Sequence, residues 1–315
     1  ALSHYCNLRS HELGADQRDK LRSLSDTSAS ALYTDYILRQ KRSWADVLYD
    51  FDSLRTDDST LTLPALVSLL APLRPREFSI ASSPTMEYAQ NNTFAMDLTV
   101  AVVEGTTPLG RPYHGLCSTY LARSAVGDAL RVWIRPGSFH HLPISAANLE
   151  IPVLYAGAGT GIAPLRGLIQ ERQACRHPNS YSDTKASEER DSVSWETPEI
   201  LLFGCRKEST DFYYKEEWRK MEEEGSLTLL PAFSRDQWHK FYVQQRIRQA
   251  DPQGEMLLHH LVARQGHLYI AGGAKMARSV KEEIVELLDL HLGGKATQFL
   301  AQLQRQGRFR VEAWS

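Results

Sequence analysis

The sequence predicts a multidomain protein with β and α/β parts, and three observations predict it. Residues 1–72 have a helical pattern, residues 73–150 show a period of two, and residues 151–315 alternate short apolar runs with helical stretches. These patterns are typical of a helical segment, an antiparallel sheet or barrel, and a parallel doubly wound sheet. The length of 315 residues also exceeds one ordinary hydrophobic core, so more than one domain is expected.

The composition is that of a globular protein with no general affinity for nucleic acid or membranes. Hydrophobic residues make up 42%, charged residues 23%, and the formal net charge is -2. No apolar run approaches the roughly 18 residues of a membrane span, and the N-terminus lacks a signal-peptide pattern. The cysteines are widely spaced, so neither a disulfide framework nor a metal site is expected. We therefore expect a cytoplasmic protein without nucleic-acid or membrane partners.

The helical segment, residues 1–72, is expected to carry no chemistry. Ser43 is placed to cap one helix, and Thr62 with Pro64 marks the start of another. The apolar residues expected to share helix faces are Leu32, Tyr33, Tyr36 and Ile37 on one face, and Trp44, Val47, Leu48 and Phe51 on another.

The next region alternates as strands do, and two of its stretches are unusual for plain strands. The alternating apolar positions are Phe94, Met96, Leu98, Val100 and Val102, followed later by Val132 and Ile134. In the first unusual stretch, Arg76 offers a guanidinium fork for a pyrophosphate, Phe78 a stacking face and Ser79 a hydroxyl donor. In the second, Ser118 is placed to cap a short helix whose free N–H groups would face a phosphate. A strand with a surface arginine and a capped turn is the alternative for both.

The stretch from Ile151 to Pro164 reads as a buried strand, a glycine-rich loop and a helix. Gly157, Gly159 and Gly161 allow a tight turn in which backbone N–H groups can approach a phosphate. The dinucleotide fingerprint G-x-G-x-x-G is not met, because its third glycine would fall at Ile162. A strand-to-helix turn without a ligand therefore stays open as an alternative.

Beyond this loop, short apolar runs at 200–203, 227–230 and 268–270 predict further parallel strands. The segment 176–198 is polar and aperiodic, and it is expected to be a disordered insertion. A final strand is expected to end in Trp314, which would either plug the core or cover a planar ligand.

Basic residues follow two of these strands where open parallel sheets bind ligands. Arg206 stands where an NAD-binding fold usually carries an acidic residue against the ribose, so it favours a 2′-phosphate. After the next strand, Ser234, Arg235, Lys240 and Tyr242 offer groups suited to a phosphate and an adjoining adenine. A solvated helix face is the alternative.

Taken together, these motifs resemble the diflavin reductase branch of the ferredoxin-NADP reductase family, in the same order and over nearly the whole chain. The branch that serves cytosolic iron–sulfur assembly looks closest, and cytochrome P450 reductase and methionine synthase reductase are competing branches. The motifs are Arg76-x-Phe-Ser79, Gly115-Leu-Cys-Ser118, Gly157-x-Gly-Thr-Gly-Ile-Ala-Pro164, Gly204-Cys-Arg206, Ser234-Arg235, Lys240-x-Tyr242 and Glu312-x-Trp314-Ser315.

The resemblance implies a helical connecting segment over 1–72, part of an antiparallel FAD barrel over 73–150, and an NADPH domain over 151–315. It implies hydride transfer from NADPH to FAD, with Ser79 and Glu312 at the reacting atoms and Trp314 stacked on the flavin until nicotinamide replaces it. The implied FAD contacts are Arg76, Phe78, Ser79, Gly115, Leu116, Cys117 and Ser118. The implied NADPH contacts are Gly159, Thr160, Gly161, Arg206, Ser234, Arg235, Lys240 and Tyr242.

The resemblance also implies parts that this sequence does not carry. Relatives have an FMN domain and the first barrel strands before the point where this chain begins, so the barrel is expected to be incomplete. Electrons would pass to that FMN domain and then to an anamorsin-type iron–sulfur protein. Related reductases often have Cys-Gly-Asp where this chain has Ala271-Gly272-Gly273, and Tyr where it has Phe78. A non-catalytic NADPH-binding or scaffold module is therefore the alternative function.

Overall fold

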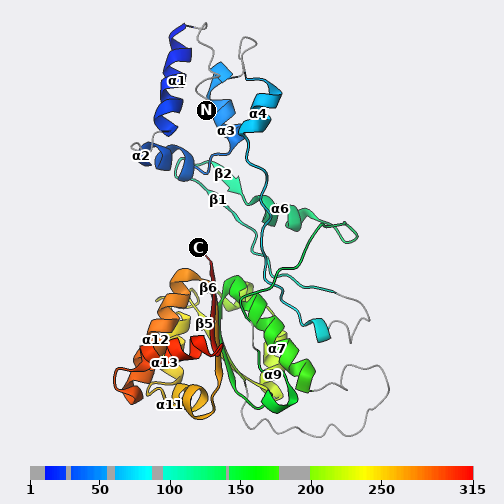
Figure 1. Ribbon diagram of the computed structural model, residues 1–315, viewed down its shortest axis with the longest axis vertical. Helices are drawn as coiled ribbons and strands as arrows, with labels where there is room; N and C mark the ends of the chain where they lie inside the picture. The colour runs from blue at the N-terminus through cyan, green and yellow to red at the C-terminus, as the bar shows by residue number, and fades with distance from the viewer. Residues whose placement is uncertain are drawn as a thin grey trace. The chain divides into compact units, whose positions relative to one another are not determined.

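The computed structural model describes residues 11–25, 30–54, 61–86, 95–139, 142–176 and 199–314. The chain separates into two compact units, unit 1 of residues 1–77 and 101–129, and unit 2 of residues 78–100 and 130–315 (Figure 1). Residues 78–100 therefore belong to the same unit as the parallel sheet. Apart from Arg176, the expected insertion at 176–198 lies outside the described residues.

Unit 1 begins with short helices around a small apolar core. The core consists of Leu21, Leu24, Val47, Phe51 and Leu54, against which Tyr36 and Ile37 pack, whereas Leu32 and Tyr33 stay exposed. The described elements are α1 (His11–Ser25), α2 (Ser30–Tyr33), the π-helical turn η3 (Thr34–Leu38), α3 (Trp44–Asp50), the 3-10 turn η4 (Asp52–Leu54) and α4 (Leu63–Leu69).

Both predicted helix starts in this segment are confirmed. The Ser43 hydroxyl accepts the N–H of Asp46, and the Asp46 carboxylate accepts the N–H of Ser43, which makes a reciprocal capping box at the start of α3. The Thr62 hydroxyl accepts the N–H of Ala65 at the start of α4, with Pro64 in the first turn. These caps depend on residues only three positions apart, which is why the sequence reveals them.

The predicted antiparallel part is small. β1 (Glu104–Thr106) pairs antiparallel with β2 (Pro112–His114), and the helix α6 (Leu116–Arg123) follows. Of the expected strand over 94–102, the described residues make one isolated antiparallel bridge, between Ile80 and Leu98. Residues 131–136 alternate in sequence but form no strand in the described structure. An alternating segment becomes a strand only where a neighbouring strand takes its hydrogen bonds.

The predicted parallel α/β fold is confirmed in unit 2. All pairs in its sheet are parallel, and the strand order is β5-β4-β3-β6-β7. The chain builds outward from β3 to β5 and then returns to β6 on the other side of β3. Ligands in open sheets bind at such a reversal, outside the carboxyl ends of the strands. The strands are β3 (Val153–Ala158), β4 (Glu199–Cys205), β5 (Leu227–Phe233), β6 (His267–Gly273) and β7 (Phe309–Trp314).

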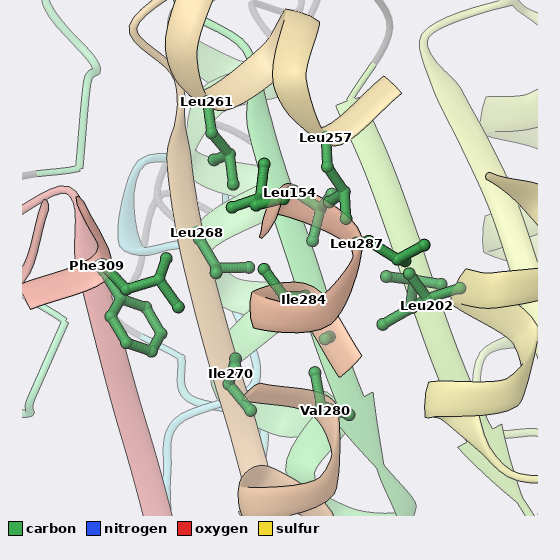
Figure 2. Close-up of a cluster of buried hydrophobic side chains, with 14 of the residues drawn as sticks. Leu154, Leu202, Leu257, Leu261, Leu268, Ile270, Val280, Ile284, Leu287 and Phe309 are labelled. Carbon is green, nitrogen blue, oxygen red and sulfur yellow. The ribbon is translucent and has the colours of Figure 1, made fainter. Parts of the chain in front are cut away.

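Helices cover both faces of this sheet (Figure 1). On one face, Ile162, Leu165 and Ile169 of α7 (Ile162–Arg176) and Trp218 of α9 (Lys215–Glu223) are fully buried. On the other face, α12 (Ala274–Leu292) packs against the strands in the larger hydrophobic core, in which Leu154, Ile270 and Ile284 meet (Figure 2). That face carries α10 (Val243–Ala250), α11 (Glu255–Leu258), the π-helical turn η7 (His259–Ala263), α12 (Ala274–Leu292) and α13 (Ala296–Arg305). The remaining short elements are η5 (Ala146–Asn148), η6 (Gly159–Gly161) and α8 (Glu208–Asp211).

A buried ion pair ties α7 to the first residue of β4. Arg172 and Glu199 are both 0% exposed, and Nε of Arg172 lies 2.6 Å from a carboxylate oxygen of Glu199. The same guanidinium donates to the carbonyls of Pro143, Leu149 and Ile151. A buried charge is tolerated only when it is paired and hydrogen-bonded, and here it fixes the segment that enters β3.

Candidate functional site

The glycine-rich loop after β3 is a turn that needs glycine at two positions, for two different reasons. Gly159 has a φ of +56°, in the left-handed region that favours glycine. A Cβ at Gly161 would lie 2.1 Å from the carbonyl oxygen of Ala271 at the end of β6. The turn η6 passes directly into α7, so the positive end of that helix opens onto the loop. This arrangement suits a phosphate held by backbone N–H groups.

The structure brings the basic residues after β4 and β5 together. The N–H of Ser234 donates to the carbonyl of Cys205 over 2.9 Å, and the N–H of Arg235 donates to the carbonyl of Arg206 over 2.8 Å. Arg206, Arg235 and Lys240 are exposed, and none of them has an ion-pair partner within the described ranges. These three cations follow the carboxyl ends of β4 and β5 and have no ion-pair partner among the described residues, so they attract a phosphate dianion.

Tyr242 reaches the same edge because α10 starts there. A Cβ at Gly204, in β4, would lie 2.4 Å from a methyl group of Val243, the first residue of α10. Tyr242 is the residue before α10 and is partly exposed, and its N–H donates to the side chain of Gln245 over 2.8 Å. The close approach at Gly204 therefore places Tyr242, which precedes Val243, near the end of β4, and Arg206 directly follows that strand.

Beside these cations lies an open hollow of about 510 Å³, lined by Glu208, Ser209, Lys215 and Asp236. Its only cation among these residues, Lys215, is paired with Glu208 over 3.0 Å. Two carboxylates would repel a phosphate, so we assign the phosphate to the exposed cations rather than to the hollow. Burial raises the pKa of the neighbouring Cys205 thiol to about 12, and the carboxylates of Asp211, Asp236 and Glu208 add to this effect.

Ser79 and Glu312 meet at the carboxyl end of the sheet. The Ser79 hydroxyl donates a hydrogen bond to a carboxylate oxygen of Glu312, on β7. In the register of β6 and β7, Glu312 pairs with Ala271, and Trp314 pairs with Gly273. Phe78 is half-buried, and Trp314 is 39% exposed. The structure thus places Ser79 and Glu312 in contact, and the end of β6 that carries Glu312's partner also borders Gly161.

The residues expected to hold the FAD pyrophosphate are divided between the two units. Arg76 and Gly115 to Ser118 belong to unit 1, whereas Phe78 and Ser79 belong to unit 2. Arg76 is exposed, and its guanidinium donates to the carbonyl of Arg74. Leu116 is exposed, and Cys117 is half-buried with a free thiol.

The expected capping role of Ser118 is wrong. Gly115 is the N-cap of α6, and Ser118 lies in the first turn of that helix. The Ser118 hydroxyl instead accepts the N–H of Val103 over 3.0 Å, because the chain at Val103 passes against the helix start. A Cβ at Gly115 would lie 2.7 Å from Cβ of Val103 and 2.6 Å from the Ser118 hydroxyl oxygen. The first N–H groups of α6 have no acceptor within the helix, so they still suit a phosphate.

The residues present fit both nucleotides. A Cβ at Gly161 would meet the backbone of Ala271, and one at Gly115 would meet Val103 and Ser118, so both turns need glycine to bring their backbone N–H groups into place. The exposed cations at Arg206, Arg235 and Lys240 match a 2′-phosphate in charge. Within the described residues, no group of three or more His, Cys, Asp or Glu side chains could hold a metal ion.

The sequence analysis missed the polar side chains in the middle of α7. Arg166, Gln170 and Glu171 all contact the segment that follows Ser79. The available signal was their position on a helix that must pack against a buried sheet, where polar residues need partners. The partners come from residues 81–97, which no local pattern connects to α7.

Comparison with known proteins agrees with this geometry. Residues 3–120 match the family described as FAD binding domain, and residues 156–282 match the family described as Oxidoreductase NAD-binding domain. The two matches are the pair of domains found in the ferredoxin-NADP reductase family, and the chain belongs to that family.

Within that family the chain belongs to the diflavin reductase branch. It is 35% identical to NADPH-dependent diflavin oxidoreductase 1 of Mus musculus over 308 residues, which are 95% of this chain and 46% of the relative. The protein of the same name from Xenopus laevis is 35% identical, over 99% of this chain and 47% of the relative. NADPH--cytochrome P450 reductase of Musca domestica is 33% identical, over 100% of this chain and 46% of the relative. The chain spans about half the length of the curated relatives it matches. In the described residues, no helix has the length and apolar character needed to cross a membrane.

Proposed function

We propose that this chain is the FAD- and NADPH-binding part of an NADPH-dependent diflavin oxidoreductase. The single observation that carries the proposal is the contact of Ser79 with Glu312 at the edge of the sheet that holds the glycine-rich loop. A hydroxyl and a carboxylate in contact, next to a phosphate-binding turn, suit a reaction in which a nucleotide cofactor must be oriented.

NADPH is preferred over NADH in this proposal because of the cations beyond β4 and β5. Arg206, Arg235 and Lys240 would bind the 2′-phosphate, with the Ser234 hydroxyl as a further donor and Tyr242 against the adenine. The backbone at Gly159, Thr160 and Gly161 would bind the pyrophosphate. The support is that these cations lie exposed and unpaired within the described structure.

FAD is the second cofactor in this proposal. Arg76 and the backbone at Gly115 to Ser118 would bind its pyrophosphate, through the N–H groups of Leu116, Cys117 and Ser118, because the Gly115 N–H donates to the carbonyl of Val103. Phe78 would lie against the flavin ring. The support is the start of α6, where three N–H groups have no intrahelical acceptor.

When both cofactors are bound, they supply the transfer of a hydride from NADPH to FAD. The protein contributes orientation and one polar pair. The Ser79 hydroxyl would donate to the flavin in place of Glu312, and the Glu312 carboxylate would then stabilise the positive charge of the nicotinamide. Trp314, at the end of β7, would cover the flavin until the nicotinamide displaces it.

We further propose that the electrons pass to an FMN domain and then to an anamorsin-type iron–sulfur protein in the cytoplasm. The support is the similarity to proteins named NADPH-dependent diflavin oxidoreductase 1 and the share of their length that this chain spans. A cytochrome P450 reductase type of acceptor is the alternative, because one relative carries that name.

A non-catalytic NADPH-binding or scaffold module is a second candidate function. Ala271-Gly272-Gly273 favours it, because these residues bring neither a thiol nor a carboxylate to the edge of the sheet beside Glu312. The antiparallel sheet of unit 1 has two strands in the described residues, which also favours weak flavin binding.

The visible absorption spectrum separates the two candidates. The purified chain, after incubation with FAD and gel filtration, should retain a flavin spectrum that NADPH bleaches under nitrogen. NADH at the same concentration should bleach it far more slowly. A chain with intact circular dichroism that stays colourless after reconstitution would contradict the oxidoreductase and support the scaffold.

A further inference from the structure

The helix that follows the glycine-rich loop also holds the segment that carries Ser79. A Cβ at Gly167, in the middle of α7, would lie 3.2 Å from the carbonyl oxygen of Ser82 and 3.3 Å from that of Ile80. The backbone of this segment therefore lies directly on the surface of α7. Any larger residue at position 167 would push the segment away.

Side chains one turn further along α7 hold the next part of the segment. The Ser83 N–H donates to the side-chain oxygen of Gln170 over 3.1 Å. The hydroxyls of Ser83 and Thr85 donate to the two carboxylate oxygens of Glu171 over 2.6 Å and 2.7 Å. Ser83 is fully buried by these contacts. Gln170 is itself oriented, because its amide donates to Glu217 on α9 over 2.8 Å.

Arg166 joins this segment to a second, later segment. Its Nη1 donates to the carbonyl of Ala81 over 2.8 Å and to the carboxylate of Asp97 over 2.9 Å. Its Nε donates to Glu217 over 2.7 Å. The side chain of Arg166 is only 11% exposed, so its bonds to Ala81 and Glu217 are largely shielded from water and strengthened, whereas the Asp97 carboxylate is half-exposed.

Tyr214 completes the arrangement from the start of α9. The Arg166 guanidinium lies over the Tyr214 ring, 4.2 Å from its centroid, and the Tyr214 hydroxyl lies 2.6 Å from that of Thr99. Tyr214 has a φ of +60°, which non-glycine residues rarely adopt. A residue keeps such a strained backbone conformation when its neighbours hold it there. Tyr214 is held by the guanidinium over its ring, by the hydroxyl contact with Thr99 and by its position at the start of α9.

These contacts extend to Ser79 through a short and rigid path. The Ala81 N–H donates to the carbonyl of Asp97 over 2.8 Å, and Ile80 is bridged to Leu98. Ser79 directly precedes this bridge and bonds to Glu312. At the other end, α7 begins at Ile162, right after Gly161, about 6 Å along the helix axis from Arg166.

We propose that Arg166 is a positioning residue, which holds the segment at 80–83 on α7 and thereby keeps Ser79 against Glu312 at a fixed place relative to the glycine-rich loop. This inference rests on the proposed function for its chemical purpose. Arg166 itself touches neither Ser79 nor Glu312, and it acts through the backbone at Ala81 and through Asp97.

Hydrogen–deuterium exchange on the purified chain tests the holding role without any cofactor. In Arg166→Gln, exchange in peptides covering 78–86 should accelerate by about tenfold or more, because charged hydrogen bonds that fix the segment are lost. Exchange in β3 and β4 should stay unchanged. Arg166→Lys keeps the charge but not the planar fork, so it should fall between the two. Arg219→Gln is the matched control, since Arg219 makes a half-exposed pair with Glu222 on α9.

Single-turnover reduction of bound FAD tests the positioning role. In Arg166→Gln the rate constant at saturating NADPH should fall by about 10- to 100-fold, the loss that displaced reacting groups cause. Affinity for 2′,5′-ADP should not change, because the cations beyond β4 and β5 are untouched. Arg166→Lys should recover part of the rate, which a purely structural loss would not show.

Three results would overturn the inference. They are unchanged exchange at 78–86 in Arg166→Gln, equally faster exchange throughout the sheet, and faster local exchange with an unchanged reduction rate. The proposed function fails by a different result, a wild-type chain whose flavin is not reduced by NADPH. In that case the exchange experiment alone decides whether Arg166 holds the segment, and unchanged exchange there refutes it.

Discussion

Ser79 donates a hydrogen bond to Glu312, which lies 233 positions further along the chain. The bond joins the segment held on α7 to the last strand of the parallel sheet. The bond forms only when the Ser79 segment and β7 are both in place, so the contribution of each residue can be tested by its own substitution.

Removing either partner should slow flavin reduction by NADPH. Ser79→Ala and Glu312→Gln should each lower the single-turnover rate by about 100-fold, because a positioned proton donor or acceptor contributes at least that much. The affinity for 2′,5′-ADP should stay the same. The control is Glu282→Gln, an exposed carboxylate on α12. An unchanged rate in both variants would remove Ser79 and Glu312 from the reaction.

Preference for NADPH should depend on the cations beyond β4 and β5. Arg235→Ala or Lys240→Ala should weaken NADPH binding by roughly 10- to 150-fold, since a charged hydrogen bond contributes about 1.5 to 3 kcal/mol. Binding of NADH should barely change, which titration of both cofactors will show. Arg305→Ala, at the exposed end of α13, serves as the control. Equal weakening of both cofactors would mean that these cations do not contact the 2′-phosphate.

The glycine-rich loop should not tolerate a methyl group at position 161. In Gly161→Ala the new Cβ would meet the carbonyl oxygen of Ala271 at 2.1 Å, so the ends of β3 and β6 must separate. The expected loss is about 1 to 3 kcal/mol of unfolding free energy, measured by urea denaturation, together with loss of NADPH binding. Gly137→Ala is the matched control, because its Cβ would have no atom within 4 Å. Equal stability of the two variants would contradict the close approach.

Breaking the buried ion pair should be far more costly than breaking an exposed one. Arg172→Met removes one donor from the buried Glu199 carboxylate and leaves the carbonyls of Pro143 and Ile151 without that donor, at a cost of about 3 kcal/mol of unfolding free energy. Arg176 still donates to Glu199 and to the carbonyl of Leu149, which limits the loss. Arg248→Met breaks ion pairs with Glu283 and Glu286 that are partly exposed, at a cost below about 1 kcal/mol. Urea denaturation at pH 7 compares them, and similar losses would refute the distinction.

Alkaline pH should destabilise the fold partly through Cys205. Burial and nearby carboxylates raise the pKa of its thiol from 9.0 to about 12 in the folded protein. Between those two values the unfolded chain loses a proton that the folded chain keeps, so the unfolding free energy falls as pH rises. The stabilisation is fully present below pH 9. Denaturation at pH 8 to about 10.5 should show a shallower decline in Cys205→Ala than in the wild type. Parallel declines would show that the thiol titrates normally.

Local patterns predicted much of the fold because the deciding interactions are local. The caps at Ser43 and Thr62 involve residues three positions apart, and the central strand β3 is a continuous apolar run. The alternating stretch at 131–136 predicted a strand that the described structure does not form. Alternation reports which residues could face a core, whereas a strand also needs a partner, and partners are not local.

The candidate site shows the same division. Residue types and their place after each strand suggested the phosphate loop and the basic residues at Arg206 and Arg235, because parallel strands end at one edge. Ser118 was predicted to be the N-cap of a short helix, but Gly115 holds that position. The Ser118 hydroxyl accepts the N–H of Val103 instead, a contact with a segment 15 residues away that the local sequence does not reveal. The hydrogen bonds from Arg166 to Ala81 and Asp97 join residues far apart in the chain, so no local sequence pattern predicted them.

The amino-acid order alone therefore predicted most of the element types and the parallel sheet, and it suggested candidate phosphate-binding residues at the carboxyl edge of that sheet. Tertiary packing established which distant groups meet: Ser79 with Glu312, Arg166 with Asp97, and Arg172 with Glu199. The physical reason is that helix caps, turns and hydrophobic periodicity act within a few residues. Hydrogen bonds between remote segments form only after the sheet and its helices have packed and have excluded water from the space between them.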